Sequence, residues 1–78
     1  MKNTRSLNQI ANEIRNDWKN VNYAAEPYLK AMETLESIND NYFADSGRSI
    51  VAYFLANANT WKSETAKRIK IELKSMLK

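Results

Sequence analysis

The side chains of this sequence that could do chemistry are lysines, arginines, carboxylates and hydroxyls. The chain of 78 residues contains no Cys and no His, which excludes thiolate nucleophiles and the usual zinc ligand sets. A nucleophile would have to be a Ser, a Lys or a carboxylate in unusual surroundings. Paired carboxylates would need a cleft, which so small a helical chain rarely encloses. We therefore expect a protein that is not an enzyme and that uses no cofactor.

The densest group of oxygen ligands lies at Asp40, Asn41 and Asp45, in a stretch rich in turn-forming residues. A calcium loop requires a fixed alternation of oxygen ligands, a central Gly and a closing bidentate Glu, and that pattern is not in place here. We therefore predict no metal site. Tyr42 and Phe43 lie in the same stretch, so an aromatic side chain is expected to hold this loop to the core.

Positive charge gathers near the C-terminal end of the sequence. Residues 60–78 hold six basic residues against two acidic ones, a net charge of +4, whereas residues 22–46 hold five carboxylates against one lysine, a net charge of −4. A basic ridge at helical spacing, flanked by Arg68, is formed by Lys67, Lys70, Lys74 and Lys78. Such a ridge is commonly just solvated, but it can also contact an acidic protein, the acidic segment of another copy, or nucleic-acid phosphates.

Aromatic residues are the second candidate for a binding surface, because exposed Trp and Tyr side chains often anchor interfaces. The chain has two Trp, four Tyr and two Phe. Both Trp residues are assigned to the core, although Trp61 lies near a helix start, where an indole can stay half exposed. The predicted partner-binding residues combine the basic group with this indole: Lys62, Lys67, Arg68, Lys70, Lys74 and Trp61.

Helices must position these side chains, since one Gly and one Pro are too few for a β-rich fold. The nearly uncharged run 49–61 predicts a central helix, because it is rich in Ala and carries a broad apolar stripe. That breadth predicts contact on several sides. The helix should begin after Gly47, with Asp45 or Ser46 as its cap, and should end near residues 57–59.

Apolar residues at helical spacing predict two helices before this one. The first covers about 6–19, with Thr4 or Ser6 as its cap. The second covers about 25–38 and has Pro27 in its first turn, where a missing amide is tolerated.

A fourth helix follows a cap at Thr60 or Ser63 and reaches Leu77. Residues 1–78 therefore predict a single all-α domain, a compact bundle of about four helices with the third helix most buried. The N-terminus lacks the apolar stretch of a signal peptide, and no segment is long enough to span a bilayer. We expect a cytoplasmic protein without membrane contact.

Segments spread over nearly the whole chain carry a resemblance to known sequences. They include Leu7-Asn-Gln-Ile-Ala-Asn-Glu-Ile14, Asp17-Trp18-Lys19, Pro27-Tyr-Leu-Lys-Ala-Met32, Asp45-Ser-Gly-Arg-Ser-Ile-Val51, Tyr53-Phe-Leu-Ala-Asn-Ala58, Thr60-Trp61-Lys62, Arg68-Ile-Lys70 and Glu72-Leu73. In these segments the chain resembles a family of small helical proteins from phages and other mobile elements of Gram-positive bacteria. The resemblance brings no motif with assigned chemistry. It implies a protein that binds a host or phage protein, as a regulator or as an inhibitor of host defence of the anti-CRISPR kind.

The leading hypothesis is a non-enzymatic helical protein that binds another protein through the fourth helix and the region around Trp61. One alternative is a small basic nucleic-acid-binding protein, whose association would weaken steeply with salt. A further alternative is a homodimer in which the acidic and basic helices of two copies meet.

Overall fold

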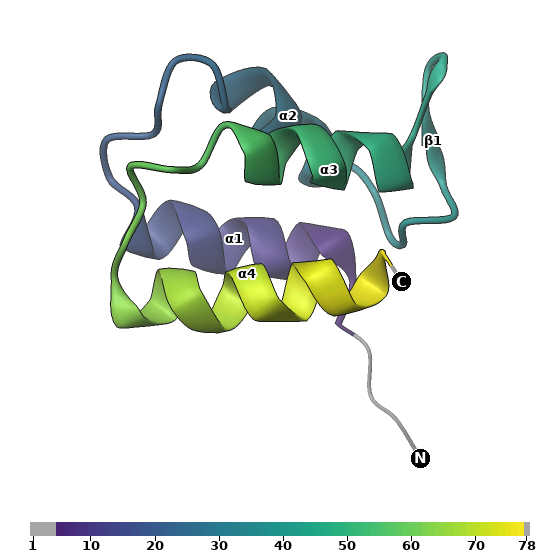
Figure 1. Cartoon of the computed structure of the whole chain (residues 1–78). Helices are drawn as coiled ribbons and strands as arrows, with labels where there is room; N and C mark the ends of the chain where they lie inside the picture. Colours follow the sequence, from purple (N-terminus) through teal and green to yellow (C-terminus); the bar gives the residue numbers. More distant parts are fainter. Residues whose placement is uncertain (1–4, 78) are drawn as a thin grey trace.

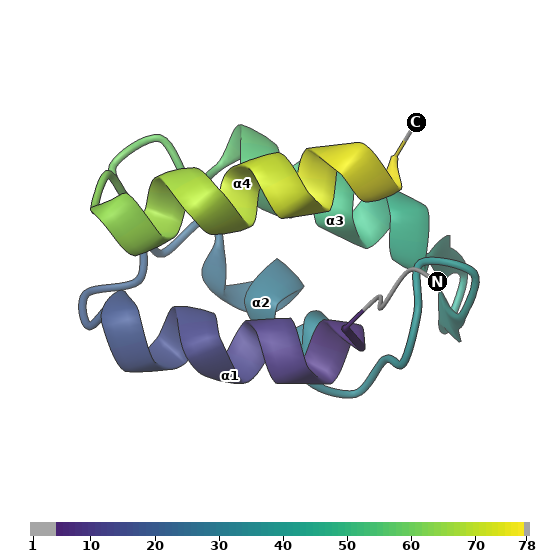
Figure 2. The same ribbon diagram turned by 90° about the horizontal axis from the view of Figure 1, so that it is seen from below.

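Two layers of two helices make up most of the chain, which a computed structural model describes over residues 5–77. The elements follow in the order α1 (Leu7–Asp17), α2 (Glu26–Met32), β1 (Asn41–Tyr42), β2 (Asp45–Ser46), α3 (Gly47–Ala56) and α4 (Glu64–Met76). In Figure 1, α2 and α3 lie above α1 and α4. Figure 2, viewed from below, shows α1 and α4 running antiparallel. The described chain is thus compact and mostly helical, with a radius of gyration of 11.4 Å.

Serine caps begin the three longer helices, as the sequence predicts. The Ser6 hydroxyl accepts from the amide of Gln9, whose side chain accepts in return from the Ser6 amide. The Ser46 hydroxyl caps α3 and the Ser63 hydroxyl caps α4, each by accepting from a backbone amide of the first turn. Thr4, the other cap candidate for α1, lies outside the described residues. The predicted bounds of α1, α3 and α4 are therefore confirmed to within a few residues.

Helix α2 is shorter than predicted, because it ends at Met32 and not near residue 38. Beyond it the backbone tightens into turns, with the Leu35 amide donating to the Met32 carbonyl at 3.2 Å. The carbonyls of Leu35 and Glu36 then accept from the amides of Asn8 and Leu7 at 3.0 and 2.9 Å. These amides belong to the first turn of α1 and have no partner within their own helix. Leu35 is buried, but its carbonyl and that of Glu36 cap α1, and this segment has a non-helical backbone.

A short antiparallel hairpin interrupts the helices, and the all-α prediction missed it. Asn41 pairs with Ser46 and Tyr42 pairs with Asp45. Phe43 lies in the connecting turn with a φ of 56°, in the left-handed region that a bulky residue rarely adopts. Tyr42 packs against the core, whereas Phe43 is 88% exposed. The expected aromatic attachment of this loop is therefore made by Tyr42.

One continuous hydrophobic core joins the two layers. Helices α1 and α3 each supply four buried residues, and α2 and α4 supply three each. Helix α3 contacts α2, α4 and β2, but it leaves Ala52, Tyr53 and Ala56 on the surface. The structure does not set α3 apart as the most buried helix.

Candidate protein-binding surface

Helix α4 presents a polar outer face because its opposite side is fixed in the core. Glu64 lies in its first turn, where the helix dipole favours negative charge. Ala66, Ile69 and Leu73 follow at i, i+3 and i+7 and are fully buried. The residues on the opposite side of α4 are consequently directed to the solvent.

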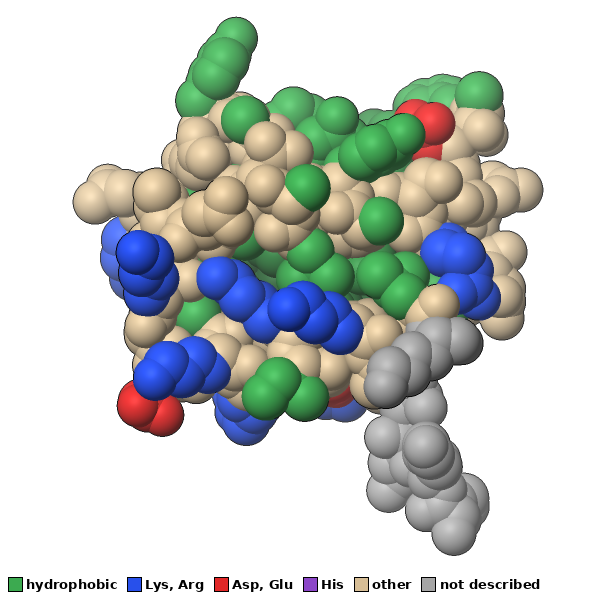
Figure 3. Space-filling model, in the orientation of Figure 1, with side chains coloured by type: hydrophobic (Ala, Val, Ile, Leu, Met, Phe, Trp, Pro, Cys, Tyr) green, Lys and Arg blue, Asp and Glu red, His purple; other side chains and the backbone are tan. Residues whose placement is uncertain are grey.

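Four lysines form a basic area over α4 and the end of the connection before it, which we call the lysine face: Lys62, Lys67, Lys70 and Lys74. Figure 3 shows basic side chains gathered over α4, with acidic atoms only at the margin. Within residues 5–77, neither Lys62 nor Lys74 has a carboxylate within ion-pair distance. Lys67 lies 3.9 Å from the exposed Glu64, a contact that contributes little in water. The positive charge of the lysine face is therefore largely uncompensated by the chain. Lys78, the last residue of the predicted ridge, lies outside the described residues.

Lys70 is the one lysine of this face with a structural role. Its ammonium donates to the carbonyls of Ala58 at 2.8 Å and Trp61 at 2.6 Å, in the connection between α3 and α4. Partial burial lowers the pKa of Lys70, and repulsion from Lys74 and Lys62 lowers it further. Lys70 thus fixes the middle of the lysine face while adding to its charge.

Arg68 differs from the predicted ridge residue, because it turns toward α1 and has partners within the chain. Its guanidinium donates to the carboxylate of Glu13, which also accepts from Arg5 at 2.6 Å. Arg5 in turn donates twice to Glu72 of α4, at 3.0 and 2.6 Å. The hydrogen bonds from Arg5 and then Arg68 lower the pKa of Glu13, because they stabilise its charged form. Arg68 therefore belongs to the contact between α1 and α4.

Trp61 lies in the core, and the half-exposed indole considered for it is not found. Its side chain is 3% exposed and stacks on Trp18 with ring centroids 5.5 Å apart and planes 8° apart. The edge of Phe54 closes the same cluster at 6.4 Å. The indole N–H donates to the Asp17 carboxylate at 2.8 Å, so the only polar atom of the side chain is already satisfied. The assignment of both Trp residues to the core is confirmed, and Trp61 has almost no surface to offer a partner.

Ile71 is the residue of this surface that sequence reasoning missed. It is 69% exposed and lies within α4, four residues after Lys67, three before Lys74 and next to Lys70. The spacing of residues in α4 could have revealed it. Ile71 does not fall at a buried position of the helix, and in the sequence it lies between Lys67 and Lys74, which are expected to be solvated. The other large apolar residues that are exposed among residues 5–77 lie on other elements: Tyr23, Phe43 and Tyr53.

Much of the acidic segment 22–46 is engaged within the chain. Arg15 of α1 donates to Glu26 at 3.0 and 2.7 Å and to Glu33 at 2.6 Å. The hydrogen bonds from Arg15 lower the pKa of Glu26. Asp40 accepts from two backbone amides in its own turn. Glu26 and Glu33 are therefore paired with Arg15 within the chain, which leaves less free negative charge for the predicted homodimer contact.

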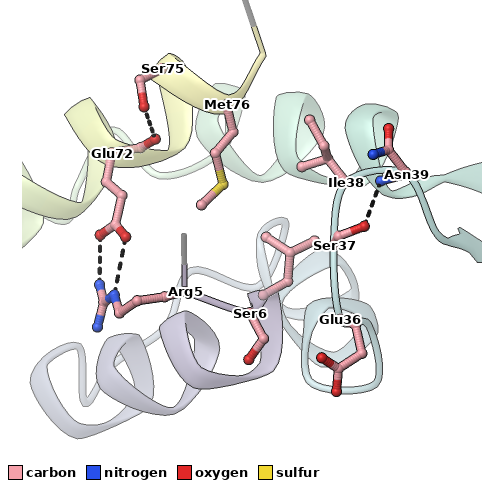
Figure 4. A pocket seen from close by; sticks show the side chains of 10 residues that line it. Arg5, Ser6, Glu36, Ser37, Ile38, Asn39, Glu72, Ser75 and Met76 are labelled. Carbon is pink, nitrogen blue, oxygen red and sulfur yellow. Dashed lines mark hydrogen bonds and ion pairs between the residues drawn. The ribbon is translucent and has the colours of Figure 1, made fainter. Parts of the chain in front are cut away.

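A pocket of about 570 Å³ opens between the start of α1, the turn at residues 36–39 and the last turns of α4 (Figure 4). Its apolar wall includes Leu7, Ile38 and Met76, and its polar wall includes the ion pair of Arg5 with Glu72. The Arg5 guanidinium is occupied by carboxylates, and the amide of Leu7 is bonded to a carbonyl. Neither group is therefore free to bind an anionic ligand in this pocket.

Comparison of the chain with protein-family models, with curated proteins and with solved structures gave no match. No helix in the described part of the chain is long and apolar enough to cross a membrane. Among residues 5–77, no three potential metal ligands come together in a cluster. The candidate surface is therefore defined by the geometry and charge of the chain itself.

Proposed function

We propose that this chain is a non-enzymatic binding protein and that its lysine face contacts an acidic protein. The observation that carries the proposal is the gathering of Lys62, Lys67, Lys70 and Lys74 on and just before α4, where the described part of the chain supplies almost no carboxylate partner. Arg5, Arg15 and Arg68 bind glutamates of the same chain, whereas Lys62 and Lys74 have no carboxylate partner within residues 5–77. Uncompensated charge on one face speeds association with a partner of opposite charge and selects against partners of like charge.

An acidic protein is favoured over nucleic acid by the kinds of side chain at this surface. Arginine is the residue best suited to bidentate phosphate contacts, and three of the four arginines of this chain are committed to internal ion pairs. Proteins that bind single strands also offer aromatic side chains for base stacking. The exposed aromatic residues among residues 5–77 lie on the α1–α2 connection, the hairpin and α3, and none lies on α4.

The proposal also covers the kind of protein that is bound and the compartment in which it is bound. The resemblance to small phage and mobile-element proteins suggests that the partner is a host or phage protein in the cytoplasm. A component of host defence is the partner that this context favours, with the chain acting as its regulator or inhibitor.

The experiment that tests the proposal is affinity capture from a nuclease-treated lysate of the bacterial host. A double charge reversal, Lys62→Glu with Lys74→Glu, is compared with Lys19→Glu and Lys30→Glu, which change two exposed lysines elsewhere by the same charge. We expect a stoichiometric protein to be retained by the wild type and the control pair and lost by the first pair. Equal retention by both variants, or recovery that disappears with nuclease, would contradict the proposal.

A further inference from the structure

One residue beside the lysines of α4 is a largely exposed isoleucine. Ile71 is 69% exposed, so it adds little to the buried core of α4. It is also a poorer helix former than Lys or Glu, because its β-branched side chain loses rotamer freedom in a helix. A residue of this kind in the middle of a charged face neither improves solubility nor stabilises the helix. Its presence is explained if it becomes buried in a complex.

We infer that Ile71 is the apolar anchor of the lysine face, and that the partner is a protein segment in which carboxylates surround an apolar patch. This inference rests on the proposed function and defines the chemistry of its partner. Positive charge around Ile71 selects carboxylates, and the isoleucine between them selects an apolar contact. An acidic amphipathic helix, with leucines along one side and glutamates beside them, has both features.

The helical geometry places the cations correctly around this anchor. Lys67 and Lys74 lie one turn before and one turn after Ile71, because residues three or four apart are neighbours on a helix surface. Lys70 precedes Ile71 and turns toward the α3–α4 connection, where it donates to the carbonyls of Ala58 and Trp61, so the lysines nearest the anchor are Lys67 and Lys74. Interfaces commonly bury a central apolar anchor inside a ring of polar residues that excludes water. The long aliphatic stems of lysine suit such a ring, since they pack while the ammonium stays hydrated.

Ile71 also provides a way to distinguish an acidic protein partner from nucleic acid. A phosphate backbone attracts positive charge and offers no apolar patch at its surface. Replacing Ile71 by Lys adds one positive charge and removes the apolar contact. The substitution should therefore weaken binding to an acidic amphipathic protein segment and strengthen binding to any ligand that is recognised by charge alone.

The test uses three probes in a fluorescence anisotropy titration at physiological salt. The first is a synthetic amphipathic helix with leucines on one side and glutamates beside them, the second is a polyglutamate peptide of equal charge, and the third is duplex DNA. The wild type is compared with Ile71→Lys and with Tyr23→Lys, which adds the same charge at a residue that is 92% exposed on another part of the surface. Circular dichroism checks that each variant is folded.

We expect the wild type to bind the amphipathic peptide about tenfold more tightly than polyglutamate, since one buried apolar anchor is typically worth that factor or more. Ile71→Lys should weaken binding to that peptide by about tenfold and strengthen binding to polyglutamate and DNA, whereas Tyr23→Lys should not weaken any of the three. If Ile71→Lys strengthens binding to all three probes, the inference is wrong while the proposed function stands. If neither peptide binds the wild type, the proposed function fails as well.

Discussion

Replacing Trp61 should destabilise the fold, and the structure sets the size of the effect. The indole is 3% exposed, stacks on Trp18 and donates to Asp17. Truncating a buried Trp to Ala costs about 3–5 kcal/mol in free energy of unfolding. At roughly 0.05–0.15 kcal/mol per residue, a chain of this length has a total of about 4–12 kcal/mol. Trp61→Ala should therefore remove a large share of the stability, and the variant is expected to be partly unfolded.

Trp61→Phe is the more informative change, because it keeps an aromatic ring against Trp18 and removes the indole N–H. Losing one hydrogen bond and part of the packing should cost about 2 kcal/mol. With a urea dependence of about 1 kcal/mol per molar, the midpoint of unfolding should fall by roughly 2 M. The assay is urea unfolding followed by circular dichroism, with Tyr23→Ala as an exposed control that should change the free energy by less than about 0.5 kcal/mol. An unchanged midpoint for Trp61→Phe would refute the assignment of this residue to the core.

Two further results are expected from the same unfolding assay. Gly47→Ala should cost about 1–3 kcal/mol, because its Cβ would lie 2.8 Å from the carbonyl oxygen of Ser37, and a stability equal to wild type would contradict this packing. The pKa values of Glu13 and Glu26 lie below the ordinary 4.5, so both carboxylates stabilise the fold fully above that pH. Their contribution to the free energy of unfolding should be lost as the pH falls below about 4.5. Arg15→Gln should make the free energy of unfolding less dependent on pH in this range. An identical pH profile for this variant would argue against the ion pair.

Local chemistry determined the parts of the fold that the sequence predicts well. Ser6, Ser46 and Ser63 each precede a run with helical apolar spacing, and each caps its helix as expected. The end of α2 depends instead on a distant contact, since the carbonyls of Leu35 and Glu36 accept from the first amides of α1. Spacing reports which residues are buried, but it does not report such long-range hydrogen bonds. The two-residue strands of the hairpin are likewise too short to produce an alternating pattern.

The candidate site could also be predicted only in part, because some of its side chains depend on long-range contacts. Helical spacing placed Lys67, Lys70 and Lys74 on one side of α4, and all three lie there. Spacing alone could not show that Arg68 turns to Glu13 on α1, because that depends on which helix lies beside α4. The exposure of Trp61 depended in the same way on the packing of α1 against the α3–α4 connection.

The measurement that tests the central claim most directly is a nuclear magnetic resonance titration of the ¹⁵N-labelled chain with the acidic amphipathic peptide. It reports at each amide whether the lysine face is the surface that binds. The account predicts that the largest chemical-shift changes occur at residues 62–74 and that residues 41–46 of the hairpin change little. Changes centred on the hairpin or on the outer face of α3, with residues 62–74 unaffected, would contradict it.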